Sequence, residues 1–99
     1  MRCQAVIVKR PDEKYPIGLR YISPDLESGE IITGCVVEIT PVETGGLEAV
    51  GSPILNIDTV TQMIDKGLDG SEYYVKFLTT ISSGHIYEDA IFIKVREIE

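Results

Sequence analysis

His85 is the only histidine in the chain, and histidine is the side chain best suited to acid–base chemistry near neutral pH. General acid–base catalysis also needs partners within hydrogen-bond reach. His85 follows Ser82, Ser83 and Gly84, a combination typical of an exposed turn between two strands. Neither serine lies in the strand-to-helix elbow that presents a nucleophilic serine. We therefore interpret His85 as a surface turn residue and predict no catalytic residues.

Acidic side chains in the expected loops form the second group that could do chemistry, because several oxygen ligands together hold Ca²⁺. Their spacing does not match the ordered loop of an EF-hand. Paired carboxylates for glycoside hydrolysis would need a cleft, for which a small chain made of strands offers little room. We therefore predict no metal site and interpret these residues as a solvated acidic surface. They are Asp12, Glu13, Asp25, Glu27, Glu30, Asp69 and Glu72.

Two further patterns could bind a cofactor. Lys66, Gly67 and Gly70 have the composition of a phosphate-binding loop, but they lack both its Gly-Lys-Ser/Thr ending and a following helix. Cys3 and Cys35 form neither a metal-ligand spacing nor a disulfide framework, so we expect two buried, reduced thiols. The sequence therefore predicts no cofactor.

The segment from Gly67 to Phe77 carries the clearest structural signal. A glycine-bearing turn leads into an alternating strand, predicted over 73–81, whose inner face holds Tyr73, Val75, Phe77 and Thr79. A tyrosine just after such a turn is typical of a tyrosine corner, with a buried ring and a hydroxyl bonded to the backbone. The following 82–85 segment predicts a hairpin loop with a glycine at positive φ. The expected structural turn and corner residues are Gly67, Gly70, Tyr73 and Gly84.

Short apolar stretches between glycines and prolines predict the remaining strands. The 59–65 segment could form a helix capped by Asp58, but its threonine, valine and isoleucine content favours a strand. In the third strand we expect Cys35, Val37 and Ile39 on one face and Ile32, Val36 and Glu38 on the other. In the last strand we expect Ile91, Ile93 and Val95 inside and Lys94 and Arg96 outside. The predicted strands are 5–8, 17–21, 31–39, 47–50 ended by 51–53, one or two within 54–64, 73–81 and 86–98.

About seven short strands with regular turn signals predict an all-β fold, an antiparallel β-sandwich similar to immunoglobulin or fibronectin type III domains. The 99 residues are expected to form a single domain, 1–99. The net charge of -7 opposes binding to nucleic acid or to an anionic membrane surface. No apolar run approaches the roughly 20 residues that span a bilayer. The N-terminal segment lacks the features of a signal peptide, so we expect synthesis in a cytoplasm.

Several segments resemble a family of small tailed-phage and prophage virion proteins, often described as fibre-tail adaptors. Residues 65–75 are similar to the family's Ser-Gly-Gly-x-x-Gly-x-x-Tyr-x-Val stretch, and residues 79–85 are similar to its Thr-x-Ser-x-Gly-Arg hairpin. Segments 30–37 and 91–95 resemble two of its strands, and 9–11 with 19–22 resemble its opening. Two positions depart from the pattern: Lys66 replaces the first glycine of a pair, and Val37 stands where an aromatic residue is usual.

The resemblance implies a phage or prophage virion structural protein of the tail or neck region, made in the bacterial host cytoplasm, that binds and does not catalyse. The implied partners are other virion proteins, and the chain is expected to be a homo-oligomer in the assembled particle. Contacts are expected at edge strands or at the loops of one end, with acidic loops meeting a basic patch. Exposed aromatics also favour interfaces, and the candidates are Tyr15, Tyr21, Tyr74 and Tyr87. The alternative is an Ig-like adhesion module that binds carbohydrate or protein outside the cell.

Overall fold

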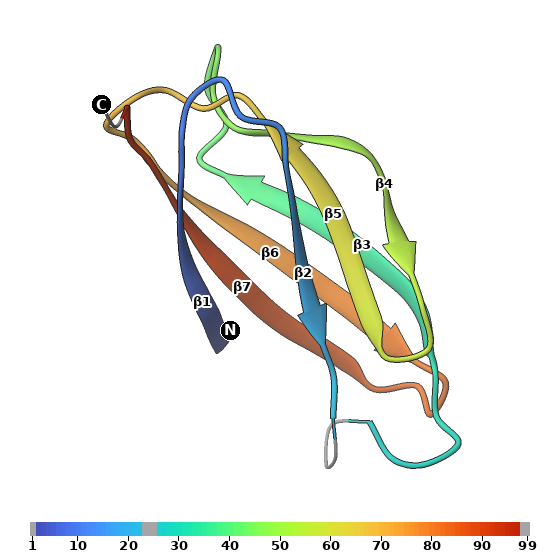
Figure 1. Cartoon of the computed structure of the whole chain (residues 1–99). Helices are drawn as coiled ribbons and strands as arrows, with labels where there is room; N and C mark the ends of the chain where they lie inside the picture. The colour runs from blue at the N-terminus through green and yellow to red at the C-terminus, as the bar shows by residue number, and fades with distance from the viewer. Residues whose placement is uncertain (1, 23–25, 98–99) are drawn as a thin grey trace.

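The chain folds into two stacked β-sheets (Figure 1). The computed structural model describes residues 2–22 and 26–97, the side chains of residues 2–4 excepted. None of these residues lies in a helix, so the predicted all-β sandwich is confirmed. The strands are β1 (Arg2–Lys9), β2 (Tyr15–Arg20), β3 (Ile32–Thr40), β4 (Glu48–Leu55), β5 (Thr59–Asp65), β6 (Glu72–Ile81) and β7 (Ile86–Val95).

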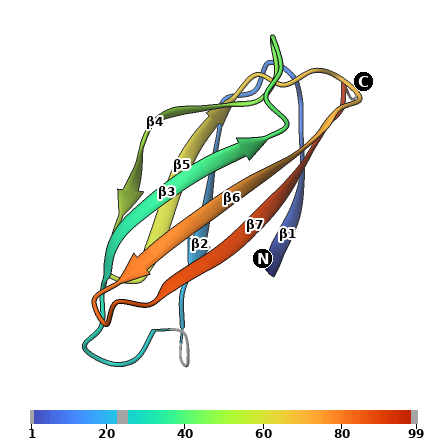
Figure 2. The same ribbon diagram turned by 180° about the vertical axis from the view of Figure 1, so that it is seen from behind.

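The strands are divided between a four-stranded sheet, in the order β1-β7-β6-β3, and a three-stranded sheet, in the order β2-β5-β4. Figure 2 views the molecule from behind, so the four-stranded sheet faces the viewer. Neighbouring strands are antiparallel except β1 and β7, which are parallel. An Ig-type sandwich separates its strands B, D and E from C, F and G in the same way. The finer Ig-like assignment stays a prediction, because this partition alone does not establish it.

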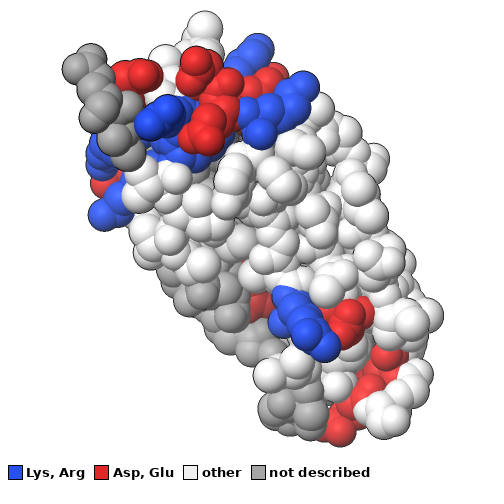
Figure 3. Space-filling view, viewed as in Figure 1, with Lys and Arg blue, Asp and Glu red and all other residues white. Residues whose placement is uncertain are grey.

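The molecule is elongated, measuring 45 × 21 × 19 Å, and most of its connections lie at the two ends. The outer face of the β2-β5-β4 sheet is largely uncharged between those ends (Figure 3). Charged side chains gather mainly where the connections lie, so the two ends differ from the sheet face in character.

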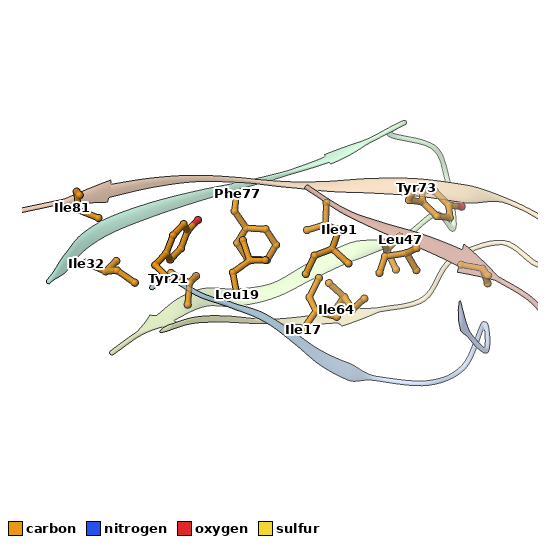
Figure 4. Close-up of a cluster of buried hydrophobic side chains, with 14 residues drawn as sticks. Ile17, Leu19, Tyr21, Ile32, Leu47, Ile64, Tyr73, Phe77, Ile81 and Ile91 are labelled. Carbon is orange, nitrogen blue, oxygen red and sulfur yellow. The ribbon is translucent and has the colours of Figure 1, made fainter. Parts of the chain in front are cut away.

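The core lies between the sheets because each strand places alternate side chains on its inner face. Every expected inner residue of β6 and β7 is buried, which confirms both predicted faces. The β2-β5-β4 sheet supplies the opposing apolar layer, and Figure 4 shows the two layers meeting. Full burial of one such side chain contributes about 1.5–3 kcal/mol. The opposing residues are Ile17, Leu19, Val60 and Ile64 from one sheet and Tyr73, Val75, Phe77, Ile91, Ile93 and Val95 from the other.

One β-bulge overturns a predicted strand face. Ile32 is expected on the same face as Val36, but Ile32 is only 5% exposed whereas Val36 is 58% exposed. The pairing of β3 with β6 shifts register between Ile32 and Gly34. An extra residue in one strand reverses the facing of everything beyond it, so Ile32 joins the core.

A second irregularity lies in β4. The predicted strand end at 51–53 is wrong, since β4 continues to Leu55 with a register shift between Val50 and Ile54. The buried Gln62 side-chain amide donates hydrogen bonds to the carbonyls of Val50 and Gly51, which holds the bulge in place. The 54–64 segment therefore contributes to two strands, and β5 is a strand, as predicted. The predicted strand 86–98 ends at Val95, and Ile98 lies outside the described residues.

Tyr73 ties together two connections at one end of the sandwich. Its ring is completely buried at the start of β6. Its hydroxyl accepts the Leu68 backbone N–H at 3.1 Å and donates to the carboxylate of Glu43. The segment between β5 and β6 and the segment between β3 and β4 are consequently held to the same side chain.

Lys9 is a buried cation at the same end, and its burial carries no signal in the sequence. Its Nζ donates to the carbonyls of Arg10 and Lys66, both at 2.6 Å. The Lys9 carbonyl accepts the Arg96 N–H at 2.9 Å. Burial lowers the pKa of Lys9, and the nearby carboxylates, Asp65 foremost, oppose that change. The ammonium therefore joins the end of β1 to the β5–β6 connection.

Replacing Gly67 with alanine is expected to destabilise the fold. Gly67 has φ of 111°, and an added Cβ would lie 2.7 Å from Val95 Cγ2. Backbone strain of this kind costs about 1–3 kcal/mol. Chemical denaturation measures the loss, and Gly34→Ala is the control because its Cβ would meet nothing within 4 Å. Equal stability of the two variants would contradict the prediction.

Tyr73→Phe is expected to lower stability by about 1–2 kcal/mol, because the Leu68 N–H and the Glu43 carboxylate each lose a partner. Thermal denaturation measures this as a fall in Tm of roughly 4–16 °C. The control is Tyr74→Phe, which alters the adjacent, exposed tyrosine. An unchanged melting curve for Tyr73→Phe would rule out a stabilising role for its hydroxyl.

Candidate binding surface

The side chains best suited to catalysis or metal binding do not come together at one site in the described residues. His85 lies exposed in the β6–β7 turn, as predicted, with its ring edge-on to Tyr87 at 6.2 Å between centroids. Across residues 2–22 and 26–97, no group of three His, Cys, Asp or Glu side chains has the arrangement of a metal site. Within the same ranges, we find no helix with the length and apolar character to cross a membrane.

The structure separates the acidic loop residues into two groups. Asp12, Glu13, Asp69 and Glu72 lie at the end that holds Tyr73 and Lys9. Glu27 and Glu30 lie in the connection between β2 and β3, at the opposite end. Asp25 lies outside the described residues. The predicted acidic surface is therefore divided between both ends of the sandwich.

Three connections meet at the end remote from Tyr73, which we call the tip. It comprises residues 21–22 and 26–31 between β2 and β3, 56–58 between β4 and β5, and 82–85 between β6 and β7. The tip is the lower end of the molecule in Figure 1. Since β2, β4 and β5 belong to one sheet and β3, β6 and β7 to the other, the tip bridges both layers.

Backbone hydrogen bonds join these connections to one another. The Asp58 carbonyl accepts the Tyr21 N–H at 2.8 Å, and the Ile57 carbonyl accepts the Ile32 N–H at 3.0 Å. On the other side, the Ser82 N–H donates to the Ile31 carbonyl at 2.8 Å, and the Ile31 N–H donates to Ser82 Oγ at 3.1 Å. The tip is therefore a surface whose backbone is already fixed.

Large apolar side chains project from this fixed backbone. Ile57 is 69% exposed and Ile22 is 67% exposed. Ile31 and Leu55 are exposed as well. A hollow of about 320 Å³ lies among Ile31, Ile32, Leu55, Asn56 and Ile57. Exposed apolar side chains grouped around a hollow, as Ile31, Leu55 and Ile57 are, mark interaction sites more often than scattered ones do. We call Ile22, Ile31, Leu55 and Ile57 the apolar tip.

A buried chain of polar groups lies behind the tip. Tyr21 is a predicted candidate for exposure, but this prediction is wrong, since Tyr21 is 5% exposed and crosses the core (Figure 4). Its hydroxyl lies 2.9 Å from both Thr79 Oγ1 and Asp89 Oδ2. One hydroxyl proton serves one acceptor, so Tyr21 donates to the Asp89 carboxylate and accepts from Thr79. Cys35 Sγ, 3.6 Å from Thr79 Oγ1, extends the chain.

Burial is the largest influence on the pKa values of Tyr21 and Cys35 in this group of polar side chains. It raises the pKa of Tyr21 far above its usual value near 10; the Asp89 carboxylate adds to the rise, and the Thr79 hydrogen bond opposes it. Burial also raises the pKa of the Cys35 thiol. Cys35 is free and partly buried, short of the full burial that we expect from sequence. The side chain of Cys3 lies outside the described residues.

The Glu30 carboxylate accepts hydrogen bonds from two connections of the tip. Its carboxylate accepts the Glu27 backbone N–H at 2.9 Å. A hydrogen bond from Ser83 is the largest cause of a lowered Glu30 pKa, followed by the Glu27 N–H, with a smaller contribution from His85. Glu30 therefore favours its ionised form more strongly than an isolated glutamate does, and it links the β2–β3 connection to the β6–β7 turn.

A second apolar surface lies on the outer face of the β1-β7-β6-β3 sheet. The strand register places Val6 beside Phe92 and Phe92 beside Tyr74. The rings of Tyr74 and Phe92 lie 4.8 Å apart between centroids, and Val6 is 59% exposed. Ion pairs such as Lys76 with Glu38, at 3.3 Å, interrupt this face. It is therefore a mixed surface, unlike the apolar tip.

The family model described as podophage GP4 fiber-tail adaptor protein gp77 matches residues 9–94. The chain belongs to this family. A search of the curated proteins found no match to it. The segment shared with the adaptor family includes strands β2 to β6, all of β7 except Val95, and every tip residue. It also contains Tyr21, Thr79 and Asp89, so the matched segment holds the buried polar chain together with the surface in front of it.

The family match confirms the predicted resemblance to tailed-phage fibre-tail adaptors. An adaptor of the virion acts as a component of an assembled particle. The turn and corner positions Gly67, Gly70, Tyr73 and Gly84 all lie within the matched segment, and each of the three glycines has positive φ. Their proposed role concerns the frame of the protein, since none of them belongs to the apolar tip.

Tyr21→Phe is expected to destabilise the fold by about 1–3 kcal/mol, because the buried Asp89 carboxylate loses a donor. A pH effect follows from the raised folded-state pKa of Tyr21. The stabilisation from the neutral hydroxyl is complete below the unfolded value near pH 10 and is lost as pH rises beyond it. Urea denaturation between pH 8 and about pH 11 should show a smaller alkaline loss for Tyr21→Phe than for the parent chain.

Tyr15→Phe is the control for this measurement, because Tyr15 is exposed at the start of β2. It should match the parent chain at every pH. An identical alkaline loss in the parent and in Tyr21→Phe would contradict the assignment of the hydroxyl as the group responsible.

Proposed function

We propose that the chain is a non-catalytic structural component of a phage or prophage virion that joins a tail fibre to the tail by protein–protein contacts. Membership of the fibre-tail adaptor family supports this role. The observation that carries it to particular residues is the apolar tip, where exposed side chains stand on a backbone fixed by hydrogen bonds between both sheets. Its partners are other virion proteins.

The physical case for the tip rests on preorganisation. Association loses free energy when loops and side chains must become ordered at an interface. The tip connections are already joined through Asp58, Ile57 and Ser82, so less ordering is needed on binding. Interface energy also concentrates in a few side chains that fill pockets near the centre. The hollow beside Ile57 provides such a pocket.

The other expectations of the sequence fit this role as proposals. One folded unit spanning 1–99 would present the tip at one end, with Gly67, Gly70, Tyr73 and Gly84 maintaining its frame. Copies arranged around a tail axis would form a homo-oligomer with closed symmetry. The outer face with Val6, Phe92 and Tyr74 is available for contacts between copies, because it faces away from the core.

Ile57→Asp is expected to weaken binding to the partner virion protein at least tenfold, because a carboxylate would replace an exposed apolar contact. The measurement is titration calorimetry with the purified tail and fibre proteins of the same phage. Ile54→Asp is the matched control: Ile54 is 65% exposed, close to the 69% of Ile57, but does not line the hollow. Both variants should retain the parent melting temperature.

Mass spectrometry of purified virions tests the role itself. The chain should be present in fixed proportion to the tail proteins. Its absence from virions, or the lack of binding to every tail and fibre protein, would overturn the proposed function. Equal weakening by Ile57→Asp and Ile54→Asp would show that binding does not depend specifically on the apolar tip.

A further inference from the structure

We propose that the tip binds a protein surface in which an apolar side chain is flanked by lysine or arginine. This inference rests on the proposed function and names the chemistry of the partner at the same site. It follows from the distribution of charge along the molecule, which only the folded structure displays.

Most lysines and arginines whose side chains the structure describes lie away from the tip. Lys9, Arg10, Lys14, Lys66 and Arg96 lie at or beside the opposite end, where Figure 3 shows blue and red side chains intermixed. Among the side chains that the structure describes, Arg20 is the one lysine or arginine beside the tip, and it pairs with Asp58 at 3.1 Å. That pair is neutral overall.

Three glutamates lie in or beside the connections that form the tip. Glu27 and Glu30 lie in the β2–β3 connection, and Glu88 lies near the start of β7. Glu30 is held by Ser83 and by the Glu27 N–H, so its charge has a fixed position. The tip therefore combines exposed apolar side chains with carboxylates in its connections. Complementary charge around an apolar contact speeds association and excludes wrong partners.

The same distribution disfavours a second copy as the occupant. Two tips facing each other would bring like charges together, which is unfavourable. The opposite end of another copy offers no strong positive field, since Lys66 pairs with Glu48, Arg96 pairs with Glu72, and Lys9 is buried. The favoured occupant is therefore a different protein, with an apolar side chain for the hollow and cations for the carboxylates of the tip.

The test uses the purified tail or fibre protein whose binding Ile57→Asp weakens. The double variant Glu27→Lys/Glu88→Lys should bind it about tenfold more weakly at low salt. The parent chain should lose affinity as NaCl rises from 50 to 500 mM, because screening shortens the range of charge interactions, whereas the double variant should lose little.

The matched control is Asp12→Lys/Glu97→Lys, which changes the net charge equally at the other end, where both side chains are exposed. Glu30 is left unchanged because its carboxylate has hydrogen-bond partners within the tip. Melting curves establish that all variants are folded. The control should keep the parent's affinity and salt dependence.

The outcomes separate this inference from the proposed function. Binding that is sensitive to Ile57→Asp but indifferent to salt and to the glutamate reversals would overturn the inference and leave the adaptor role standing. Equal weakening by both double variants would also overturn it, since net charge and not the tip would then be responsible. A dimer that Ile57→Asp dissociates, detected by light scattering, would identify a second copy as the occupant and refute the inference. Lack of binding to any tail or fibre protein would overturn both.

Discussion

The hydrogen bond between the Tyr21 hydroxyl and the buried Asp89 carboxylate is the constraint on which the tip depends. A carboxylate in an apolar core is costly unless donors satisfy it, and the Tyr21 hydroxyl reaches Asp89 across the space between the sheets. Thr79 completes the arrangement by donating to the same hydroxyl. Tyr21 also donates its backbone N–H to Asp58, so one residue orients both the sheet packing and the first connection of the tip.

The two ends of the sandwich are stabilised by different means. At one end, Tyr73 and Lys9 use a hydroxyl and a buried ammonium to hold the connections around β6. At the tip, carbonyls of the β4–β5 turn and the Ser82 hydroxyl join loops from both sheets. Both ends expose apolar side chains, Val42 at the first and Ile57 at the tip. At the tip, exposed apolar side chains line a hollow, and this arrangement directs the search for a partner there.

Membership of the fibre-tail adaptor family gives this contrast a context. An adaptor gains from a surface that needs little ordering on binding, because ordering costs offset affinity. The hydrogen-bonded backbone around Ile57 meets that requirement in the function that we propose, and the carboxylates nearby would select against partners of the wrong charge. The proposal thus connects stability with recognition, since the buried polar side chains lie behind the proposed binding surface.

Alternation along the sequence determined which side chains face inward. It placed Tyr73, Val75 and Phe77 in the core because successive residues of a strand point to opposite faces. It also contained the signal for Tyr21, which shares a face with Ile17 and Leu19. The bulge between Ile32 and Gly34 was not predicted, because an extra residue is set by pairing with β6 and not by local pattern.

By itself, then, the sequence determined the all-β class, most strands, the exposed His85 turn and the family resemblance, since these depend on local periodicity and short motifs. Only the tertiary structure decided that Tyr21 meets Asp89, that Lys9 reaches the Lys66 carbonyl, and that distant isoleucines share one hollow. These facts depend on sheet order and on residues far apart in the chain, and no local pattern encodes such distances.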